Sequence, residues 1–294
     1  YYWGGDNNYV GGPNRHDLYR NDKEIFLDGQ YFPDLMVKEA KKVIDKKSED
    51  PFFIFFAMNT PHYPYQGYAK WIKYYRDKGV KHPRDLYAAF LTTQDEKIGE
   101  LIELLEENEL RDDTIIIFQS DNGHSTETRA YHGGGYTGPY RGAKQSLFEG
   151  GIRVPAAISW PGKIPANQFR DQMSVNVDWM PTLIELCGFD TDTSDMDGKS
   201  LLPIIENKNT PSNHEKGYCW EFGRRGDPTW VARKGKWKLY ANPYDTSRRE
   251  YTYPEKFVLF DLENDPGESI NLYNQKPNIV NELKSLYKNW KSKQ

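Results

Sequence analysis

Three apolar runs constrain this chain more than any other feature of its sequence. They are Phe52–Ala57, Thr114–Gln119 and Val154–Trp160. Runs of this kind are typical of strands that are buried on both faces of a parallel sheet. Amphipathic stretches lie between them, one beginning at Pro33 and one extending from about Asp85 to Glu107. The alternation of strands and helices predicts an α/β fold with a largely parallel central sheet.

The sheet predicted in this way is small. Sheets usually have about five or six strands, and only 37% of the 294 residues are hydrophobic. We therefore expect the sheet to be incomplete here and further strands to lie outside this sequence. Residue 1 is Tyr rather than Met, as expected of a processed or partial product, and residues 1–32 show no helical or strand period, which indicates a long surface loop.

The bulk composition excludes several classes of protein. Aromatic residues make up 15% of the chain, which is incompatible with intrinsic disorder. The net charge of −4 argues against a nucleic-acid partner, for which a basic face is expected. No apolar run approaches the roughly 20 residues that a membrane-spanning helix needs, so no membrane span is expected.

The sequence changes character after about Pro211. Short aromatic or β-branched runs, divided by Gly, Pro and Asp, predict antiparallel hairpins at Tyr218–Phe222, Thr229–Arg233, Lys236–Tyr240 and Phe257–Asp261. A final amphipathic helix is expected from Pro277 to Trp290, packed on that sheet. We predict two domains: residues 1–210, the α/β part, and residues 211–294, a small domain with an antiparallel sheet and a helix.

A short helix is expected between these regions, from Trp179 to Leu186. Asp178 is its predicted N-cap, and Cys187-Gly188 ends it. Cys187 and Cys219 show no metal-ligand spacing, and we interpret both as buried thiols.

The segment Asp121-Asn122-Gly123 directly follows the second apolar run. Asn-Gly is a strong turn dipeptide, so a plain turn is the ordinary interpretation. However, ligand sites of parallel α/β sheets gather at the carboxyl ends of strands. A carboxylate and an amide carbonyl are oxygen donors suited to Ca²⁺ or Mg²⁺, although calcium takes about six to eight ligands and needs more donors than these two.

His62 follows the first apolar run, in the segment Thr-Pro-His-Tyr-Pro. A single histidine is more often structural than catalytic. Prolines on both sides restrict the backbone and give the ring a defined direction, and histidine is the usual general acid near neutral pH. We therefore consider His62 a candidate proton donor.

Lys144 lies in the Gly-rich stretch from Arg141 to Pro155, just before the third apolar run. The glycines match neither a P-loop nor a dinucleotide fingerprint. The ordinary interpretation is a solvated surface lysine. A cation at this place could instead bind an anionic group or offset charge on a leaving oxygen.

Five segments give the chain a family resemblance. In order, "TPHYPY", "TIIIFQSDNG", "YRGAKQSLFEGGIRVP", "DWMPTLIELCG" and "LFDLENDPGESINLY" resemble the later two thirds of the arylsulfatase-type sulfatases, within the alkaline-phosphatase superfamily. The resemblance implies an alkaline-phosphatase-like sandwich and hydrolysis of sulfuric esters. It also implies export to the periplasm or secretion.

The resemblance implies a role for each matching residue. Asp121 and Asn122 match metal ligands, with calcium the usual ion. His62 matches the histidine that protonates the leaving alcohol, and Lys144 matches the lysine that bridges the sulfate and the ester oxygen. His124 lies one step beyond the metal pair and is a possible substrate contact, or else structural.

One part of the family pattern is absent. Family members carry an earlier Cys- or Ser-x-Pro-x-Arg segment, whose first residue becomes formylglycine. No such segment occurs here, and the early acidic pair and the Lys-x-His segment are absent too. We expect formylglycine in a segment outside this sequence, and the 294 residues alone to be inactive.

Several alternatives stay open at this stage. The leading hypothesis is a sulfatase that acts on a sulfated carbohydrate, whose sugar rings would stack on aromatic side chains. The residues that could serve are Tyr63, Tyr65, Tyr136, Tyr140, Trp220, Phe222, Arg224 and Arg225. The alternatives are a phosphodiesterase or phosphonate monoester hydrolase of the same superfamily, and a non-catalytic protein that binds sulfated glycans. The oligomeric state is unknown from sequence.

Overall fold

The computed structural model describes residues 18–27, 29–45, 50–223, 227–247 and 254–294. The chain divides into two compact units. Unit 1 comprises residues 1–114 and 125–135, and unit 2 comprises residues 115–124 and 136–294. The predicted boundary between residues 210 and 211 stays a prediction.

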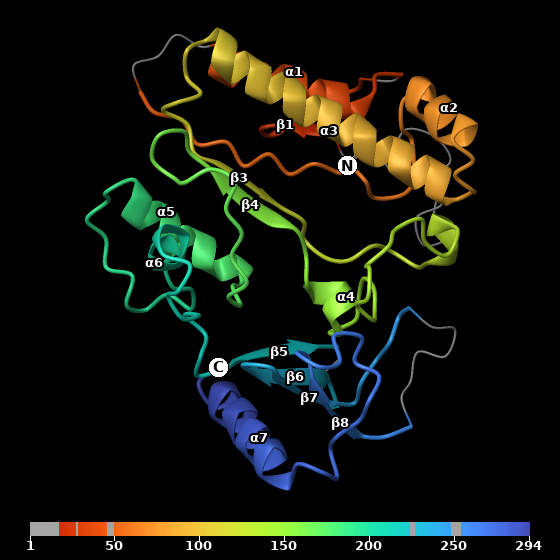
Figure 1. The fold of residues 1–294 in the computed structure, drawn as a ribbon. Helices are drawn as coiled ribbons and strands as arrows, with labels where there is room; N and C mark the ends of the chain where they lie inside the picture. The colour runs from red at the N-terminus through yellow and green to blue at the C-terminus, as the bar shows by residue number, and fades with distance from the viewer. Residues whose placement is uncertain (1–17, 28, 46–49, 224–226, 248–253) are drawn as a thin grey trace. The chain divides into compact units, whose positions relative to one another are not determined.

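Three helices dominate unit 1 (Figure 1). They are α1 (Phe32–Ile44), α2 (Ala69–Asp77) and α3 (Arg84–Glu107). The long helix α3 packs against both α1 and α2. Its buried Lys97 lies 2.7 Å from Asp34 on α1, and its buried Asp85 accepts a hydrogen bond from Arg76 on α2 at 2.8 Å. Charged pairs therefore join the three helices as well as apolar contacts.

The remaining regular structure of unit 1 is short. A hairpin of two-residue strands, β1 (Tyr19–Arg20) and β2 (Lys23–Glu24), lies in the region expected to be a loop, and η2 (Thr128–Ala130) is a single 3₁₀ turn. The rest of the predicted loop, residues 1–17 and 28, lies outside the described residues.

The run Phe52–Ala57 does not form the predicted strand. These residues adopt no regular structure, and Phe53 and Phe55 are 78% and 83% exposed. A strand needs a partner for its backbone N–H and C=O groups, and no strand in the described part of the chain pairs with this run. The prediction of a buried strand here is therefore wrong for this chain.

The second and third apolar runs do form strands, in unit 2. β3 (Ile116–Gln119) pairs with β4 (Ala156–Ser159), but the pairing is antiparallel, with Ile117 opposite Ile158. Neither strand is buried on both faces, and Phe118 is 41% exposed. Because every pair among the described strands is antiparallel, the predicted parallel pairing is wrong for these two.

Four antiparallel strands form a second sheet in unit 2, as predicted. In sheet order they are β5 (Tyr218–Phe222), β6 (Thr229–Lys234), β7 (Trp237–Ala241) and β8 (Phe257–Asp261). A tight turn joins β6 to β7, where Gly235 has φ +55°. That left-handed conformation is accessible to glycine without strain. Alternate residues of each strand face opposite sides of this sheet.

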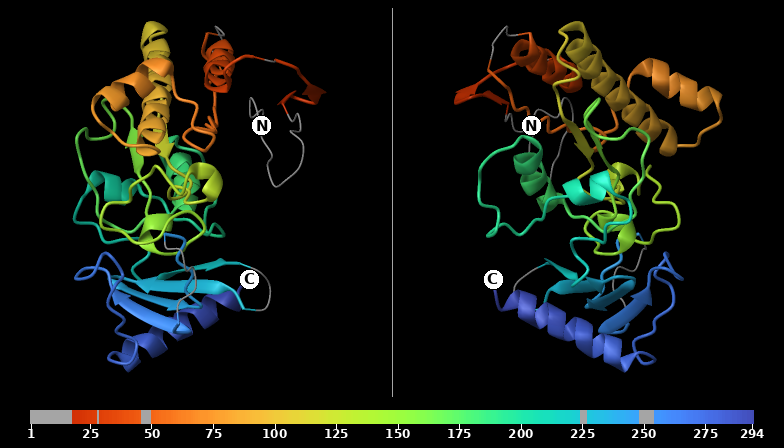
Figure 2. Two further views of the ribbon diagram at one scale, coloured as in Figure 1. Left: turned by 90° about the vertical axis from the view of Figure 1, so that its right-hand side faces the viewer. Right: turned by 60° about the vertical axis from the view of Figure 1, so that its left-hand side comes forward.

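Helix α7 (Pro277–Lys291) covers one face of the sheet (Figure 2). On that face Leu239 and Leu259 pack with Val280 and Leu283 of the helix. On the other face Val231, Tyr240, Val258 and Phe260 pack with Leu147 and Phe148. The second face therefore holds the segment that follows Lys144.

Helix α4 (Glu149–Ile152) lies between β3 and β4, and η3 (Asn176–Asp178), α5 (Trp179–Leu186) and α6 (Leu202–Glu206) follow β4 and precede β5. Helix α5 has the predicted bounds, and Gly188 follows it with φ +69°. Asp178 stands at the N-cap position but does not cap the helix. Its buried carboxylate accepts hydrogen bonds from the backbone N–H groups of Val175 and Lys199, both at 2.8 Å, and is paired with His214.

The two cysteines differ in exposure. Cys219 is buried on β5, as predicted, whereas Cys187 is exposed, so the prediction of a buried thiol there is wrong. Cys187 follows the last residue of α5 directly. Within the described residues no helix has the length and apolar character needed to cross a membrane.

Candidate active site

The segment that follows β3 is held by backbone hydrogen bonds. The N–H of Ser120 donates to the carbonyl of Pro155 at 3.2 Å, and the N–H of Gly123 donates to the carbonyl of Gly151 at 2.9 Å. Asp121 is exposed and Asn122 is half-buried. The segment is therefore more than a solvent-exposed turn, because its backbone is fixed on the stretch that ends at β4.

Gly123 is required at its position by close packing. A Cβ atom there would lie 2.0 Å from the carbonyl oxygen of Gly150 and 3.1 Å from the Cα of Gly151. The two later glycines are equally constrained, since a Cβ on Gly150 would lie 2.4 Å from the oxygen of Gly142 and one on Gly151 would lie 2.1 Å from the oxygen of Ser146. The glycines of both segments thus serve a close approach between two backbones.

Lys144 is joined to the same segment. Its backbone N–H donates to the carbonyl of His124 at 2.9 Å, and its own carbonyl accepts from Thr246 Oγ1 at 2.8 Å. The next residue, Gln145, has φ +69°, a left-handed conformation that costs a non-glycine residue about 1–2 kcal/mol. Hydrogen bonds on both sides of the lysine stabilise this conformation.

His62 belongs to unit 1. Its N–H donates to the carbonyl of Asn59 at 2.9 Å, and its ring Nδ1 lies 2.6 Å from the carbonyl oxygen of Tyr63. A carbonyl can only accept, so Nδ1 carries a proton and Nε2 is the nitrogen that gains or loses one. The ring also packs on Tyr63, with 4.4 Å between ring centroids. This geometry suits a residue that exchanges a proton through Nε2.

The structure brings four of the five predicted site residues into one unit. Asp121, Asn122 and His124 lie on one segment of unit 2, and Lys144 is hydrogen-bonded to that segment. His62 lies in unit 1. Its convergence with the other four on one substrate stays a prediction.

The donor set available for a metal is partial. Asp121 and Asn122 offer a carboxylate and an amide carbonyl, which are oxygen ligands of the type that Ca²⁺ and Mg²⁺ take. Among the residues that the structure describes, no three or more His, Cys, Asp or Glu side chains are grouped to hold a metal ion. The two residues therefore offer oxygen donors of the type that a calcium site uses.

A buried charge network begins at Glu149, just after residues 141–147, which we call the Lys144 segment. Sequence reasoning missed this network. Lys238 on β7 is fully buried, with Nζ 2.7 Å from Glu149 Oε1 and 3.1 Å from Glu268 Oε1. Glu268 also accepts from the backbone N–H of Glu149 at 2.7 Å and from the Tyr240 hydroxyl at 2.5 Å. The network thus links α4 to the sheet and to the loop after β8.

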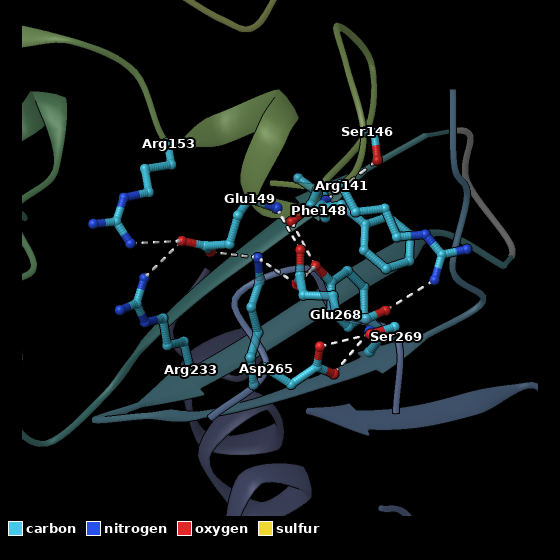
Figure 3. Close-up of polar contacts among 12 residues, drawn as sticks. Arg141, Ser146, Phe148, Glu149, Arg153, Arg233, Asp265, Glu268 and Ser269 are labelled. Atoms are coloured by element: carbon cyan, nitrogen blue, oxygen red, sulfur yellow. Dashed lines mark hydrogen bonds and ion pairs between the residues drawn. The ribbon is translucent and has the colours of Figure 1, made fainter. Parts of the chain in front are cut away.

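The two carboxylates of this network have opposite pKa shifts. Burial acts to raise the pKa of Glu149, but Lys238, Arg233 and Arg153 outweigh it and hold this pKa below its usual value. Figure 3 shows Arg153 and Arg233 beside the Glu149 carboxylate. Burial raises the pKa of Glu268 in spite of Lys238, and the charge of Glu149 adds to the increase. Because Lys238 lowers both pKa values, it stabilises the ionised form of each carboxylate.

The aromatic side chains considered for sugar binding differ in exposure. Tyr63 and Tyr65 are buried, so their rings serve packing rather than sugar binding, whereas Tyr136 is 79% exposed. Tyr140 packs under the guanidinium of Arg153, at 4.6 Å from its ring centroid. Arg224 and Arg225 lie outside the described residues.

Comparison with known proteins identifies the family. A family model described as sulfatase matches residues 1–189, more than half of the chain. The chain belongs to the sulfatase family. A second model, described as the C-terminal part of N-sulphoglucosamine sulphohydrolase, matches residues 141–293.

Individual sulfatases resemble the chain over most of its length. Arylsulfatase D of Homo sapiens is 29% identical over 257 residues, which are 80% of this chain and 42% of that protein. N-acetylgalactosamine-6-O-sulfatase of Bacteroides thetaiotaomicron is 27% identical over 314 residues, covering 99% of this chain and 57% of that protein. The chain therefore spans about half the length of these two sulfatases.

Solved structures support the fold. The structure of Ps i-CgsB in complex with k-i-k-neocarrahexaose has a TM-score of 0.79 and 26% identity, over 92% of this chain and 56% of that one. The structural neighbours include sulfatases of the alkaline-phosphatase-like fold, so the α/β class predicted from the sequence is confirmed, as is its C-terminal antiparallel sheet.

Proposed function

We propose that the protein containing this chain hydrolyses sulfate esters of a carbohydrate. Membership of the sulfatase family supports the reaction, and a relative named for N-acetylgalactosamine 6-O-sulfate supports the substrate class. The structural observation that supports it best is the hydrogen bond from the Lys144 N–H to the His124 carbonyl. It ties a lysine to a segment that carries two metal-type oxygen donors.

Each candidate residue has a proposed role. Asp121 and Asn122 hold a Ca²⁺ ion, or Mg²⁺, and His124 contacts the substrate. The Lys144 ammonium interacts with a sulfate oxygen and offsets the negative charge that develops on the ester oxygen. His62, with its Nδ1 hydrogen bonded to a carbonyl, donates the Nε2 proton to the departing alcohol.

Two further groups belong to the proposal. When bound, the metal would neutralise sulfate charge, and a formylglycine hydrate would supply the attacking oxygen. Neither Cys187 nor Cys219 begins the motif that yields formylglycine. We therefore propose that these 294 residues alone turn over no sulfate ester. Export to the periplasm or secretion is proposed from the family.

The test compares substrates and variants in the full-length, naturally occurring protein that contains this chain. Wild type, His62→Ala, Lys144→Ala and the control Lys163→Ala are assayed on an aryl sulfate, the matching aryl phosphate and a sulfated sugar. Lys163 is an exposed loop lysine of the same unit. Loss of a general acid costs about 10²–10⁴-fold in rate, so kcat/KM for the sugar sulfate should fall by that order in His62→Ala, and strongly in Lys144→Ala.

The leaving group separates the two roles. An acidic phenol departs without a proton, so His62→Ala should affect the aryl sulfate much less than the sugar sulfate. Lys144→Ala should impair both substrates. Unchanged turnover in both variants would refute the roles. Faster turnover of the phosphate would favour the phosphoester alternative, and glycan binding without turnover would favour a non-catalytic protein.

A further inference from the structure

Each of residues 244–247, which follow β7, makes a hydrogen bond to the Lys144 segment. Tyr244 accepts a hydrogen bond through its carbonyl, Asp245 through its carboxylate and Ser247 through its hydroxyl, while Thr246 donates. The four bonds are Ser146 Oγ to Tyr244 O at 2.9 Å, Arg141 Nε to Asp245 Oδ2 at 2.5 Å, Thr246 Oγ1 to Lys144 O at 2.8 Å and Gly142 N to Ser247 Oγ at 3.3 Å. We call residues 244–247 the clamp.

The clamp is itself held in a defined conformation. Asp245 is 1% exposed, and its Oδ1 accepts hydrogen bonds from the N–H of Ser247 at 3.0 Å and from the Ser247 hydroxyl at 2.6 Å. A side chain that bonds the backbone two residues ahead forms a local turn. The segment also follows β7 closely, where Leu239 and Tyr240 are fully buried. The clamp therefore holds the residues that it contacts in a fixed position relative to the sheet.

The clamp contact at Lys144 is placed to determine where this residue lies. The Thr246 hydroxyl bonds the Lys144 carbonyl, on the peptide unit that leads into Gln145, whose φ is +69°. Backbone in such a conformation persists only where the surroundings hold it. On its other side the Lys144 N–H is bonded to His124. Loss of the hydroxyl would release one of these two restraints and allow the peptide to relax.

We infer that the clamp, and Thr246 in particular, positions Lys144 for the reaction. This inference depends on the proposed function, because the effect of Thr246 passes through the ammonium of Lys144. Thr246 does not touch the substrate in this role. Its contribution lies in the backbone geometry from which the lysine side chain extends.

The experiment uses Thr246→Val, which keeps the side-chain shape and removes the hydroxyl. A matched control is Thr229→Val on β6. The Thr229 hydroxyl also donates to a backbone carbonyl, that of Asn242 just after β7, at 2.7 Å. Both variants should lower the urea midpoint by similar amounts. A misplacement of about 1 Å can reduce a rate by up to about 100-fold, so we expect kcat/KM for the sulfate ester to fall by about 5–50-fold in Thr246→Val and to stay unchanged in Thr229→Val. Thr246→Ser, which restores a hydroxyl, should recover most of the activity.

A double-mutant cycle distinguishes positioning from a general loss of stability. In the Lys144→Ala background, Thr246→Val should have no further effect on kcat/KM, because its target is already absent. An equal loss with and without Lys144, or no loss in the wild-type background, would overturn the inference.

Hydrogen exchange provides a readout that does not depend on activity. Amides of residues 141–147 should exchange faster in Thr246→Val than in Thr229→Val. If sulfate turnover is absent from the wild type, or does not depend on Lys144, the proposed function fails. If exchange in this segment is unchanged by Thr246→Val, the clamp fails, whatever the activity.

Discussion

Replacing Lys238 by Met should destabilise unit 2 strongly. The ammonium is fully buried between Glu149 and Glu268, at 2.7 and 3.1 Å. Methionine has a similar length but no charge, so the substitution leaves two carboxylates in a buried site with one fewer cation. Removal of one partner of a buried ion pair costs about 3–5 kcal/mol, a large part of a typical unfolding free energy of about 5–15 kcal/mol.

Urea unfolding followed by tryptophan fluorescence measures this effect, since Trp230 and Trp237 lie in the sheet. With a slope of about 1–3 kcal/mol per molar urea, the midpoint should fall by on the order of 2 M. The matched control is Lys234→Met on β6. Lys234 and its partner Glu282 are each 46% exposed, and such surface pairs contribute little. No measurable shift is expected from it.

The pH dependence of this destabilisation follows from the two carboxylates. In the wild type the lowered pKa of Glu149 contributes stability above its unfolded value, and that stability is lost as the pH falls through its folded pKa. Glu268 has a raised pKa, so its ionisation lowers the free energy of unfolding at neutral pH. Protonation of Glu268 restores that free energy as the pH falls. Without Lys238 both pKa values rise, so the destabilisation by Lys238→Met should be largest near neutral pH.

The destabilisation should shrink as the pH is lowered from neutral, because protonation neutralises the carboxylates that the ammonium had stabilised. A loss of less than about 1 kcal/mol at neutral pH would show that Lys238 behaves as a surface lysine does. A loss that is independent of pH would show that it arises from packing rather than from charge.

A pair of glycine substitutions and a thiol-labelling experiment test local packing. Gly123→Ala should cost about 1–3 kcal/mol, the range typical of overpacking, because its Cβ would lie 2.0 Å from the Gly150 oxygen, whereas Gly99→Ala within α3 meets nothing within 4 Å and should gain about 0.5–1 kcal/mol. Equal urea midpoints for the two variants would contradict the close packing of the segments. A thiol reagent at pH 8 should modify exposed Cys187 rapidly, but Cys219 only upon unfolding, because burial raises its pKa to about 12. Rapid modification of two thiols in the native protein would contradict the burial of Cys219.

The parts of the fold that could be predicted are those specified by local patterns. Helices α3 and α7 and the four strands of the C-terminal sheet lie within one or two residues of their predicted bounds, because amphipathic periods and turn residues are read within a short window. Phe52–Ala57 could not be assigned in this way. An apolar run becomes a strand only with a pairing partner, and its sequence does not state whether a partner is present.

The residues of the candidate site also differ in whether local sequence is enough to predict them. Asp121, Asn122, His62 and Lys144 could be proposed from sequence, since each lies near an apolar run and carries chemistry of its own. Thr246 could not, because it carries no such chemistry and reaches Lys144 across 102 residues. Lys238 could not either, because its strand alternation places it on the buried face, where a lysine is tolerated only beside Glu149 and Glu268. Residues that hold a site in place can be identified only from their contacts in the folded protein. Mutations at Thr246 or Lys238 should therefore act on the conformation of the Lys144 segment rather than directly on contacts with the substrate.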